Sequence, residues 1–455
     1  MFLLVTFGHL SLAALVFAPC FLRKDISLVD PLNLVVLYII VGAVIPVYFV
    51  AFNQTPRIQY MMAGRFNYEF LYGASWFVIS AFLIGVGNTA CRSRVRAEYI
   101  LPLDTDISVR GVQFALVAGV AISALSILVY IQQTGGLSAS ISDISRKRAI
   151  EVISNGEVVY AGAGYVNMTK NISIITVLVT LPYYLARYTR VPRVISYQLW
   201  ALVVLALTVP FLSSSRSGAV FVILGILIAL SVRDRLTIRI QLISAMAIIL
   251  GFLVMTALRT TAQQSAEFSL IGPLSAFAES GNGLSIVGTS HIIMGVPERM
   301  DYQLGSTYFS WVFAPIPRTI WPSKPDISLG KRVKAEVLQQ SVIRTGRPAS
   351  FMGEGWINFG PIGFLISSLL FGYVLRLIGN SLLPIIKERS FAVPLFYTLS
   401  LNTAALTNAA LSQGIVWILS DVAVIIFVYL IIRYSFGRKP AYRNLQPTPV
   451  TEPQQ

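Results

Sequence analysis

Eleven apolar segments divide this chain, and each is close to the length that a helix needs to cross a lipid bilayer. The segments lie near residues 2–22, 31–52, 70–90, 111–132, 168–187, 195–212, 218–232, 240–258, 359–379, 391–411 and 413–432. Only 12% of the residues are charged, against about 25% in an ordinary soluble domain, which is too few to coat a soluble globule of this size. The sequence therefore predicts an all-α polytopic membrane protein with about eleven (10–12) transmembrane helices.

The basic residues predict the orientation, because Lys and Arg concentrate in short cytoplasmic loops. With the N-terminus outside, 19 of the 35 basic residues are cytoplasmic, and nine of the other 16 lie in one long outside loop. Long loops escape this bias, so the relevant comparison is 19 to seven. The net charge of +15 is mainly a topology signal and does not indicate nucleic-acid binding. The predicted organisation is helices one to eight in 1–258, a large outside loop in 259–358, helices nine to eleven in 359–432, and a cytoplasmic tail in 433–455.

Several chemistries are disfavoured by the residues that the chain lacks. Cys20 and Cys91 form no CxxC pair and no disulfide framework, and His9 and His291 form no metal-binding cluster. A phosphate-binding P-loop is absent, so ATP-driven function is unsupported. Asp104-Thr105-Asp106 spells a pattern found in metal-dependent glycosyltransferases, but it falls on the cytoplasmic side and we attribute it to chance. We expect no metal and no cofactor.

The long outside loop combines aromatic residues with carboxylates. Tyr308, Trp321 and Trp356 offer ring faces that suit the apolar faces of sugars, while carboxylates suit sugar hydroxyls. These three residues are candidate sugar contacts. The alternative is an aromatic belt at the membrane interface.

Cations near the outer face are candidates for binding a phosphate or diphosphate. Arg318 and Lys324 lie in a segment stiffened by four prolines, Pro315, Pro317, Pro322 and Pro325. Arg216 follows the sixth apolar segment, and Arg259 ends the eighth on the same face. A guanidinium and an ammonium in fixed directions can hold a diphosphate without metal. The alternatives are a rigid surface strut for the Pro-rich segment and snorkelling side chains for Arg216 and Arg259.

Two residues are candidate general bases. Glu354 lies between Gly353 and Gly355 just before the ninth segment, where partial desolvation makes a carboxylate a usable base. His291 is the other candidate, because imidazole titrates near neutral pH. The alternatives are a carboxylate that satisfies amides at a helix start and a purely structural histidine.

Two further features bear on function. Asp421 lies within the eleventh segment, where an acid is costly and often functional, so it suggests either a proton relay or pairing with Asn402, Asn408 or Gln413. Residues 138–155 are expected to form a short interfacial amphipathic helix that carries the basic residues 146–148.

The chain resembles the Wzy-type O-antigen polymerases, also called oligosaccharide repeat-unit polymerases. The resemblance rests on three motifs in residues 215–363, about a third of the chain. They are Ser215-Arg216-Ser217-Gly218, then Pro317-Arg318-x-x-Trp321-Pro322-x-Lys324-Pro325, then Gly353-Glu354 followed by Asn358-Phe359-Gly360-x-x-Gly363.

The resemblance implies a multi-pass enzyme of the bacterial inner membrane, with a GT-C-like architecture and a site in a large periplasmic loop. Such an enzyme moves a growing glycan from undecaprenyl diphosphate onto a new lipid-linked repeat unit, making O-antigen of lipopolysaccharide or exopolysaccharide. Its expected partners are the lipid-linked donor and acceptor, the bilayer, a chain-length regulator and a flippase, with no nucleic acid.

Two rival functions remain open. An O-antigen ligase uses the same donor but transfers the glycan to a lipid A–core acceptor. A non-enzymatic flippase or transporter of lipid-linked glycans makes no bond, and Asp421 is its best support. The sequence shows no internal repeat of the kind that many transporters carry.

Overall fold

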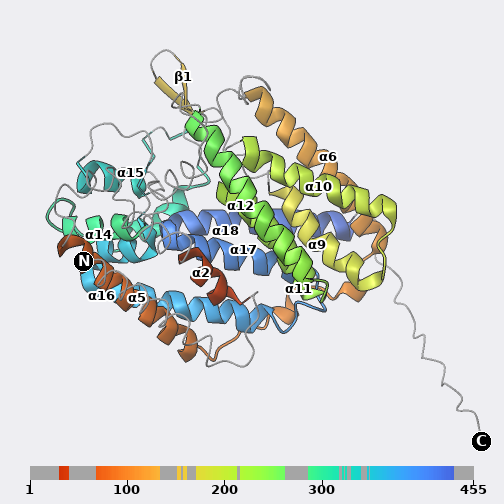
Figure 1. The fold of residues 1–455 in the computed structure, drawn as a ribbon, viewed down its shortest axis with the longest axis horizontal. Helices are drawn as coiled ribbons and strands as arrows, with labels where there is room; N and C mark the ends of the chain where they lie inside the picture. Colours follow the sequence, from red (N-terminus) through yellow and green to blue (C-terminus); the bar gives the residue numbers. More distant parts are fainter. Residues whose placement is uncertain are drawn as a thin grey trace, which may run out of the picture.

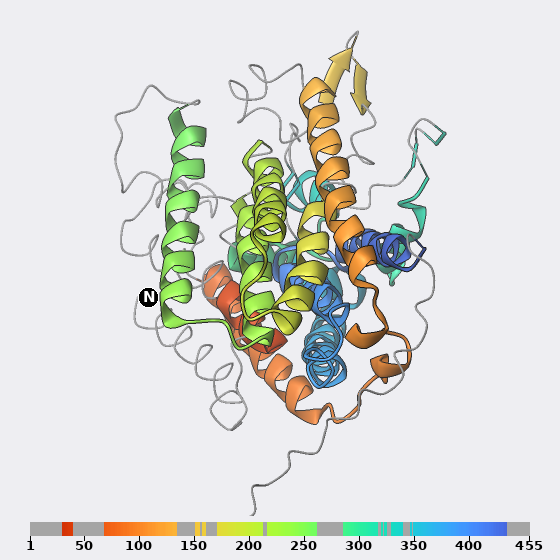
Figure 2. The ribbon, with the colours of Figure 1, turned by 90° about the vertical axis from the view of Figure 1, so that its right-hand side faces the viewer.

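The computed structural model describes residues 30–39, 68–133, 151–154, 157–160, 171–212, 216–261, 285–316, 320–321, 323–324, 329–339, 346–347 and 349–434. Within these ranges the fold is a bundle of helices with one small β-hairpin (Figures 1 and 2). The first predicted membrane segment, 2–22, and the tail beyond residue 434 lie outside the described residues.

Ten of the eleven predicted membrane segments coincide with helices, in whole or in their described part. These helices are α2 (Pro31–Ile39), α5 (Tyr68–Ala90), α6 (Val109–Gln133), α9 (Ile172–Arg187), α10 (Arg193–Leu212), α11 (Arg216–Val232), α12 (Ile238–Thr261), α16 (Ser350–Leu382), α17 (Ala392–Ala405) and α18 (Leu411–Tyr434). Four helices in the described part of the chain are long and apolar enough to cross a membrane: α6, α10, α16 and α18. The coarse prediction of a helical membrane protein is therefore supported, while the count of about eleven spans is not fixed by this criterion.

The helices at the edge of the bundle expose apolar side chains. Helix α12 stands at one side of the molecule in Figure 2, and Leu242, Met246 and Leu250 on it are 59–70% exposed. A soluble protein rarely presents such a row of large apolar side chains to water. In a bilayer the same row contacts lipid chains, while the backbone amides are satisfied within the helix.

Helices α5 and α16 run side by side (Figure 1) because glycines let their backbones approach closely. A Cβ added at Gly372 would lie 2.0 Å from the carbonyl oxygen of Ile84, and one added at Gly87 would lie 2.0 Å from that of Leu369. No side chain fits at either contact. A hydrogen bond of 2.7 Å between the hydroxyls of Ser80 and Ser368 joins the two helices at the same interface.

We expect Gly372→Val to abolish folding of the bundle, because the new side chain would overlap the Ile84 carbonyl. Folded protein extracted in mild detergent and measured by size-exclusion chromatography should fall to near background. The matched control is Gly251→Val on α12, where an added Cβ meets nothing within 4 Å. Normal yield of the Gly372→Val variant would refute the close contact.

Helix α16 is two helices joined by a sharp reversal. Phe359 and Gly360 have non-helical dihedral angles, and Gly360 has φ of 60° and ψ of −145°, which favours glycine. The arm before this turn folds back along the arm after it: the rings of Phe351 and Phe371 stack with centroids 4.0 Å apart. We call residues 350–358 the short arm and residues 361–382 the long arm. The predicted ninth segment, 359–379, corresponds to the turn and the long arm.

The predicted loop 259–358 contains several short helical elements. Helix α12 continues to Thr261 at one end of this range, and the short arm of α16 begins at Ser350 at the other. Between them lie α14 (Ser285–Gly295), η4 (Ser306–Phe313), α15 (Gly330–Arg332) and the π-helical turn η5 (Val333–Val337). Helix α14 packs on both α5 and α16, which ties this region to the bundle.

Residues 151–160 correct another expectation. The predicted amphipathic helix over 138–155 is wrong at its end, because β1 (Glu151–Ser154) pairs antiparallel with β2 (Glu157–Tyr160). Glu151 lies opposite Tyr160, and Ser154 opposite Glu157. The Ile and Val residues of both strands favour this pairing. The basic residues 146–148 lie outside the described residues.

Asp104 connects its own loop to the loops that follow α11 and α16 and to the end of α9, at the end of the bundle where the basic residues predict the cytoplasm. Its carboxylate accepts hydrogen bonds from the Ser390 amide at 2.6 Å and the Ser390 hydroxyl at 2.9 Å, and it pairs with Arg233 at 2.8 Å. Arg233 also donates to the carbonyl oxygen of Pro182 at 2.9 Å, while Arg187 donates to that of Asp104 at 3.3 Å. Asp104 therefore has a structural role in holding these segments together.

Candidate functional site

Glu354 is placed inside the bundle by the short arm of α16. Its side chain is 0% exposed, and its Oε2 atom accepts a hydrogen bond of 2.5 Å from the backbone amide of Leu411, the first residue of α18. A carboxylate at this position complements the positive end of the α18 dipole. Its Oε1 atom is buried and has no hydrogen-bond partner among the residues that the structure describes. Leaving a carboxylate oxygen unsatisfied is costly, and such costs concentrate at functional sites.

A chain of polar side chains connects Glu354 to η4. The amide of Asn358 donates to the Thr307 hydroxyl at 2.7 Å and to the carbonyl oxygen of Glu354 at 2.8 Å. Because Thr307 accepts from Asn358, its own proton is free to point toward the Glu354 carboxylate, with which its side chain interacts. The hydroxyl of Ser412 donates to the Thr307 carbonyl. Sequence reasoning missed Thr307 and Ser412 entirely, since neither stands in a recognisable motif.

The turn of α16 is closed by the segment that leads into η4. The carbonyls of Ile357 and Asn358 accept hydrogen bonds from the amides of Gln303 and Leu304, at 2.9 and 3.3 Å. The Asn358 side-chain oxygen accepts from the Gly305 amide at 2.8 Å. These bonds satisfy carbonyls that the end of the short arm would otherwise leave without partners. The segment therefore covers the turn and holds η4 above Glu354.

Tyr308 and His291 lie on elements that border the Glu354 region. The hydroxyls of Tyr308, on η4, and Ser367, on the long arm, form a hydrogen bond of 3.3 Å. Burial raises the pKa of the Tyr308 phenol, so the phenol is neutral near pH 7. His291 is half-buried on α14, the helix that packs against α16. The structure thus brings the predicted sugar contact Tyr308 and the predicted base His291 onto elements that flank the short arm.

Two of the predicted ligand contacts have structural partners instead. Trp356 is 5% exposed, and its ring packs edge-on against Trp76 with centroids 5.0 Å apart, so no face remains for a sugar. The Lys324 ammonium is buried and donates to the carbonyl oxygens of Ala314 and Ile316, at 3.1 and 2.7 Å. Trp356 therefore lies in the core. Lys324 stabilises the Pro-rich segment by binding two of its backbone carbonyls. Sequence alone gave no sign of either role.

The remaining predicted residues are placed less completely. Trp321 is half-buried, donates to the Ser323 hydroxyl at 3.0 Å and packs edge-on against Phe313, with centroids 5.5 Å apart. Arg216 begins α11 and Arg259 lies in the last turn of α12, but their side chains, like all of Arg318, lie outside the described part of the structure. The described part of the structure therefore includes none of these three guanidinium groups.

Asp421 forms a separate buried polar cluster in the middle of α18. It is 5% exposed and accepts hydrogen bonds from Asn402 on α17 at 3.0 Å and from Asn171 at the start of α9 at 2.5 Å. Asn402 is among the partners that the sequence predicted, whereas Asn171 is distant in sequence and was not. The cluster connects three helices, which gives Asp421 a packing role.

Comparison with known proteins adds no further assignment: no protein-family model, no curated protein and no solved structure matches this chain.

Proposed function

We propose that this protein polymerises undecaprenyl-diphosphate-linked oligosaccharide repeat units at the periplasmic face of a bacterial inner membrane. Its class is then a metal-independent, multi-pass glycosyltransferase that makes O-antigen or exopolysaccharide. The proposal combines the three sequence motifs with the position of Glu354. It also includes the full set of about eleven spans and the GT-C-like arrangement.

The observation that carries the proposal is the state of the Glu354 carboxylate. One oxygen is held by the start of α18, which fixes the direction of the group, and the other has no hydrogen-bond partner in the described part of the chain. A general base needs this combination of a fixed orientation and an available lone pair. Glu354 also belongs to the motif on which the resemblance to repeat-unit polymerases rests.

The proposed reaction is a displacement at the anomeric carbon of the donor glycan. A hydroxyl of the acceptor repeat unit forms the new glycosidic bond, while the bond from the anomeric carbon to the diphosphate breaks. The hydroxyl proton moves to Oε1 of Glu354, and undecaprenyl diphosphate leaves with the bonding electron pair. Arg216, Arg259 and Arg318 stabilise the developing charge on the leaving group.

Lys324 and Tyr308 have modified roles in this scheme. Because the Lys324 ammonium is engaged by two backbone carbonyls, we assign it to shaping the Pro-rich segment that carries Arg318. Tyr308 and Trp321 remain candidate sugar contacts, and His291 remains a second candidate base. Glu354 is fully buried, so the proposal requires η4 to move before an acceptor hydroxyl reaches Oε1.

The test is a polymerisation assay with purified protein and an undecaprenyl-diphosphate-linked repeat unit. We expect products longer than one repeat unit in EDTA and without ATP, seen as a ladder on a gel. Arg318→Ala should remove the ladder while leaving membrane levels of the protein intact. Growth that requires added metal would overturn the cation-clamp mechanism, and transfer only to lipid A–core would indicate a ligase.

A transporter of lipid-linked glycans is the second candidate, and one observation favours it. Helix α16 reverses within the bundle, and α17 is separated from α18 by the 3-10 turn η6 (Leu406–Asn408). Interrupted helices beside buried carboxylates are typical of transporter binding sites. Movement of a labelled lipid-linked glycan across vesicles, without any increase in chain length, would select this function.

A further inference from the structure

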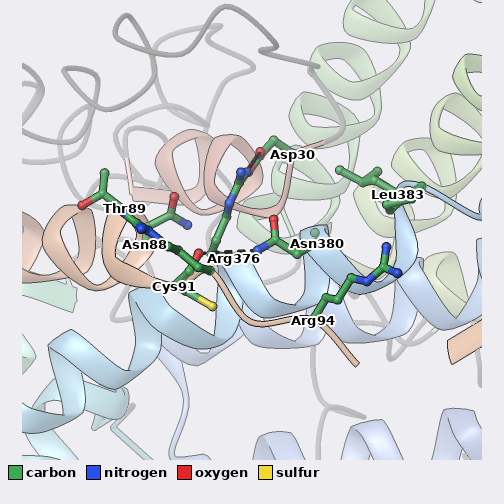
Figure 3. A pocket seen from close by; sticks show the side chains of 11 residues that line it. Asp30, Asn88, Thr89, Cys91, Arg94, Arg376, Asn380 and Leu383 are labelled. Atoms are coloured by element: carbon green, nitrogen blue, oxygen red, sulfur yellow. Dashed lines mark hydrogen bonds and ion pairs between the residues drawn. The ribbon is translucent and has the colours of Figure 1, made fainter. Parts of the chain in front are cut away.

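A cavity of about 630 Å³ opens at the end of the bundle opposite to the predicted catalytic face, between α5, α16 and the start of α2 (Figure 3). Its volume is within the range of about 300–1,000 Å³ typical of small-molecule sites. The wall combines polar Asn88, Thr89 and Asn380 with apolar Leu383. None of these residues takes part in the proposed polymerase chemistry.

The cavity walls are held rigidly by bonds between α5 and the long arm of α16. The Asn88 amide, which is 1% exposed, donates to the Gly372 carbonyl at 3.4 Å. The Asn380 amide donates to the Ser93 carbonyl at 3.1 Å, and the Tyr373 and Ser93 hydroxyls bond at 3.0 Å. The turn after α5 is thereby fixed against α16, and the arginines that follow it are held beside the cavity.

Positive charge dominates the lining. Arg92, Arg94 and Arg376 line the cavity, against a single acid, Asp30. Figure 3 shows Arg376 extending toward Asp30, with the charged atoms 4.0 Å apart. Asp30 is further engaged, because its carboxylate accepts a 2.9 Å hydrogen bond from the Leu32 amide at the start of α2. The charge of the acid is thus offset within the protein, and two arginines are left in excess.

The two arginines in excess, Arg92 and Arg94, differ in whether they form an ion pair among the residues that the structure describes. Arg94 lies 3.6 Å from Glu98 in an exposed pair that contributes little. Arg92 is exposed and has no hydrogen bond or ion pair within the described part of the chain. A guanidinium is the side chain best suited to a phosphate group, because its fork of N–H donors matches two phosphate oxygens.

The cavity also lies at the level where the membrane surface is expected. Helix α5 ends at Ala90, and the long arm of α16 ends at Leu382, so both helices reach their polar ends beside it. The turn after α5 exposes Tyr99 and Ile100, which are 77% and 78% exposed. Aromatic residues and arginines of this kind gather at the boundary between lipid and cytoplasm.

We propose that this cavity binds the phosphate-bearing headgroup of an anionic phospholipid from the cytoplasmic leaflet, with Arg92 and Arg94 as phosphate ligands. The polar side chains of Thr89 and Asn380 face the glycerol part of the headgroup, and Leu383 lies toward the acyl chains. Free inorganic phosphate shares the same ligand chemistry. The lipid is favoured because the cavity is large, has an apolar wall and opens at the membrane boundary. The proposal is independent of the polymerase function.

The test measures lipid retention by native mass spectrometry on the full chain, exchanged into phosphatidylglycerol or phosphatidylcholine. Wild type should retain phosphatidylglycerol selectively. The double variant Arg92→Gln/Arg94→Gln should bind it about a hundredfold more weakly, since each of the two lost guanidinium–phosphate contacts costs roughly a factor of ten. All four substituted positions, including those of the control, are exposed, so we expect normal folding by thermal melting.

The control double variant is Arg96→Gln/Arg110→Gln, which removes the same charge from the same end of the bundle but lies outside the cavity lining. Retention within twofold of wild type by this control, together with loss in the cavity variant, supports the site. An equal loss of phosphatidylglycerol retention in both variants would mean that general surface charge, and not the cavity, attracts the lipid. That result would overturn the proposal. Thermal stabilisation by inorganic phosphate without selective lipid retention would also overturn it, by assigning the cavity to the free anion.

Discussion

Replacing Glu354 by Gln should lower the rate of chain growth by about 100- to 10,000-fold, which is the usual contribution of a general base. Gln has nearly the same shape and keeps an oxygen that accepts the Leu411 amide, so the hydrogen bond at the start of α18 is preserved. It lacks the basic carboxylate that removes the acceptor proton in the proposed mechanism. The measurement is the initial rate of ladder formation with purified enzyme in EDTA, normalised to folded protein.

The matched control for this substitution is Glu336→Gln. Glu336 lies in the same region between α12 and α16 but pairs with Arg332 at 3.0 Å near the surface, with side-chain exposures of 41% for Arg332 and 38% for Glu336. We expect its activity to stay within about twofold of wild type, because exposed pairs contribute little. Wild-type chain growth by the Glu354→Gln enzyme would remove Glu354 from the mechanism. A loss that only follows a fall in folded protein would make it a helix cap.

Replacing Asp104 by Ala should destabilise the protein by about 2–3 kcal/mol, because Arg233 then loses the acid with which it forms an ion pair and Ser390 loses two hydrogen-bond acceptors. The pair is mostly shielded, with side-chain exposures of 12% for Arg233 and 17% for Asp104. The expected readout is a lower melting temperature in detergent. Catalytic activity per folded molecule should not change, since Asp104 lies far from the predicted catalytic face.

Asp106→Ala is the control within the same three-residue pattern. Asp106 is exposed, and within the described part of the chain its carboxylate accepts only a 3.5 Å hydrogen bond from the adjacent Thr105. We expect its melting temperature to match wild type. Activity that depended on added Mn²⁺ or Mg²⁺ and was lost in both variants would restore the metal-site interpretation that we reject.

The positions of the membrane helices were the most predictable part of this protein. Apolar segments such as 70–90 and 413–432 correspond closely to α5 and α18, because about 20 apolar residues satisfy their backbone only as a helix in lipid. The reversal of α16 was not predicted. Hydropathy reports the polarity of side chains and not the direction of the chain. The short arm was therefore assigned to the loop that leads into the ninth segment.

The candidate site was predictable only in part. Glu354 was selected because partial desolvation near a membrane boundary makes a carboxylate a usable base, and the structure places it beside the start of α18. Trp356 and Lys324 were selected by residue type. Residue type does not distinguish a ligand contact from an aromatic ring in the core or a lysine that binds backbone carbonyls. Thr307 contributes through contacts across 47 residues of sequence, and no local pattern reports such a contact.

The sequence by itself determined that this chain is a helical membrane protein, which end of the bundle carries the excess of basic residues, and which loop concentrates unusual polar residues. These properties follow from the distribution of apolar and charged side chains along the chain, and that distribution is complete before folding. Only the tertiary structure decided which polar groups meet. The reversal at Gly360 carries Glu354 to the start of α18, and the glycine contacts between α5 and α16 hold the arginine-lined cavity at the other end. Such pairings depend on close backbone approach and on the burial of individual atoms, which residues distant in sequence set jointly.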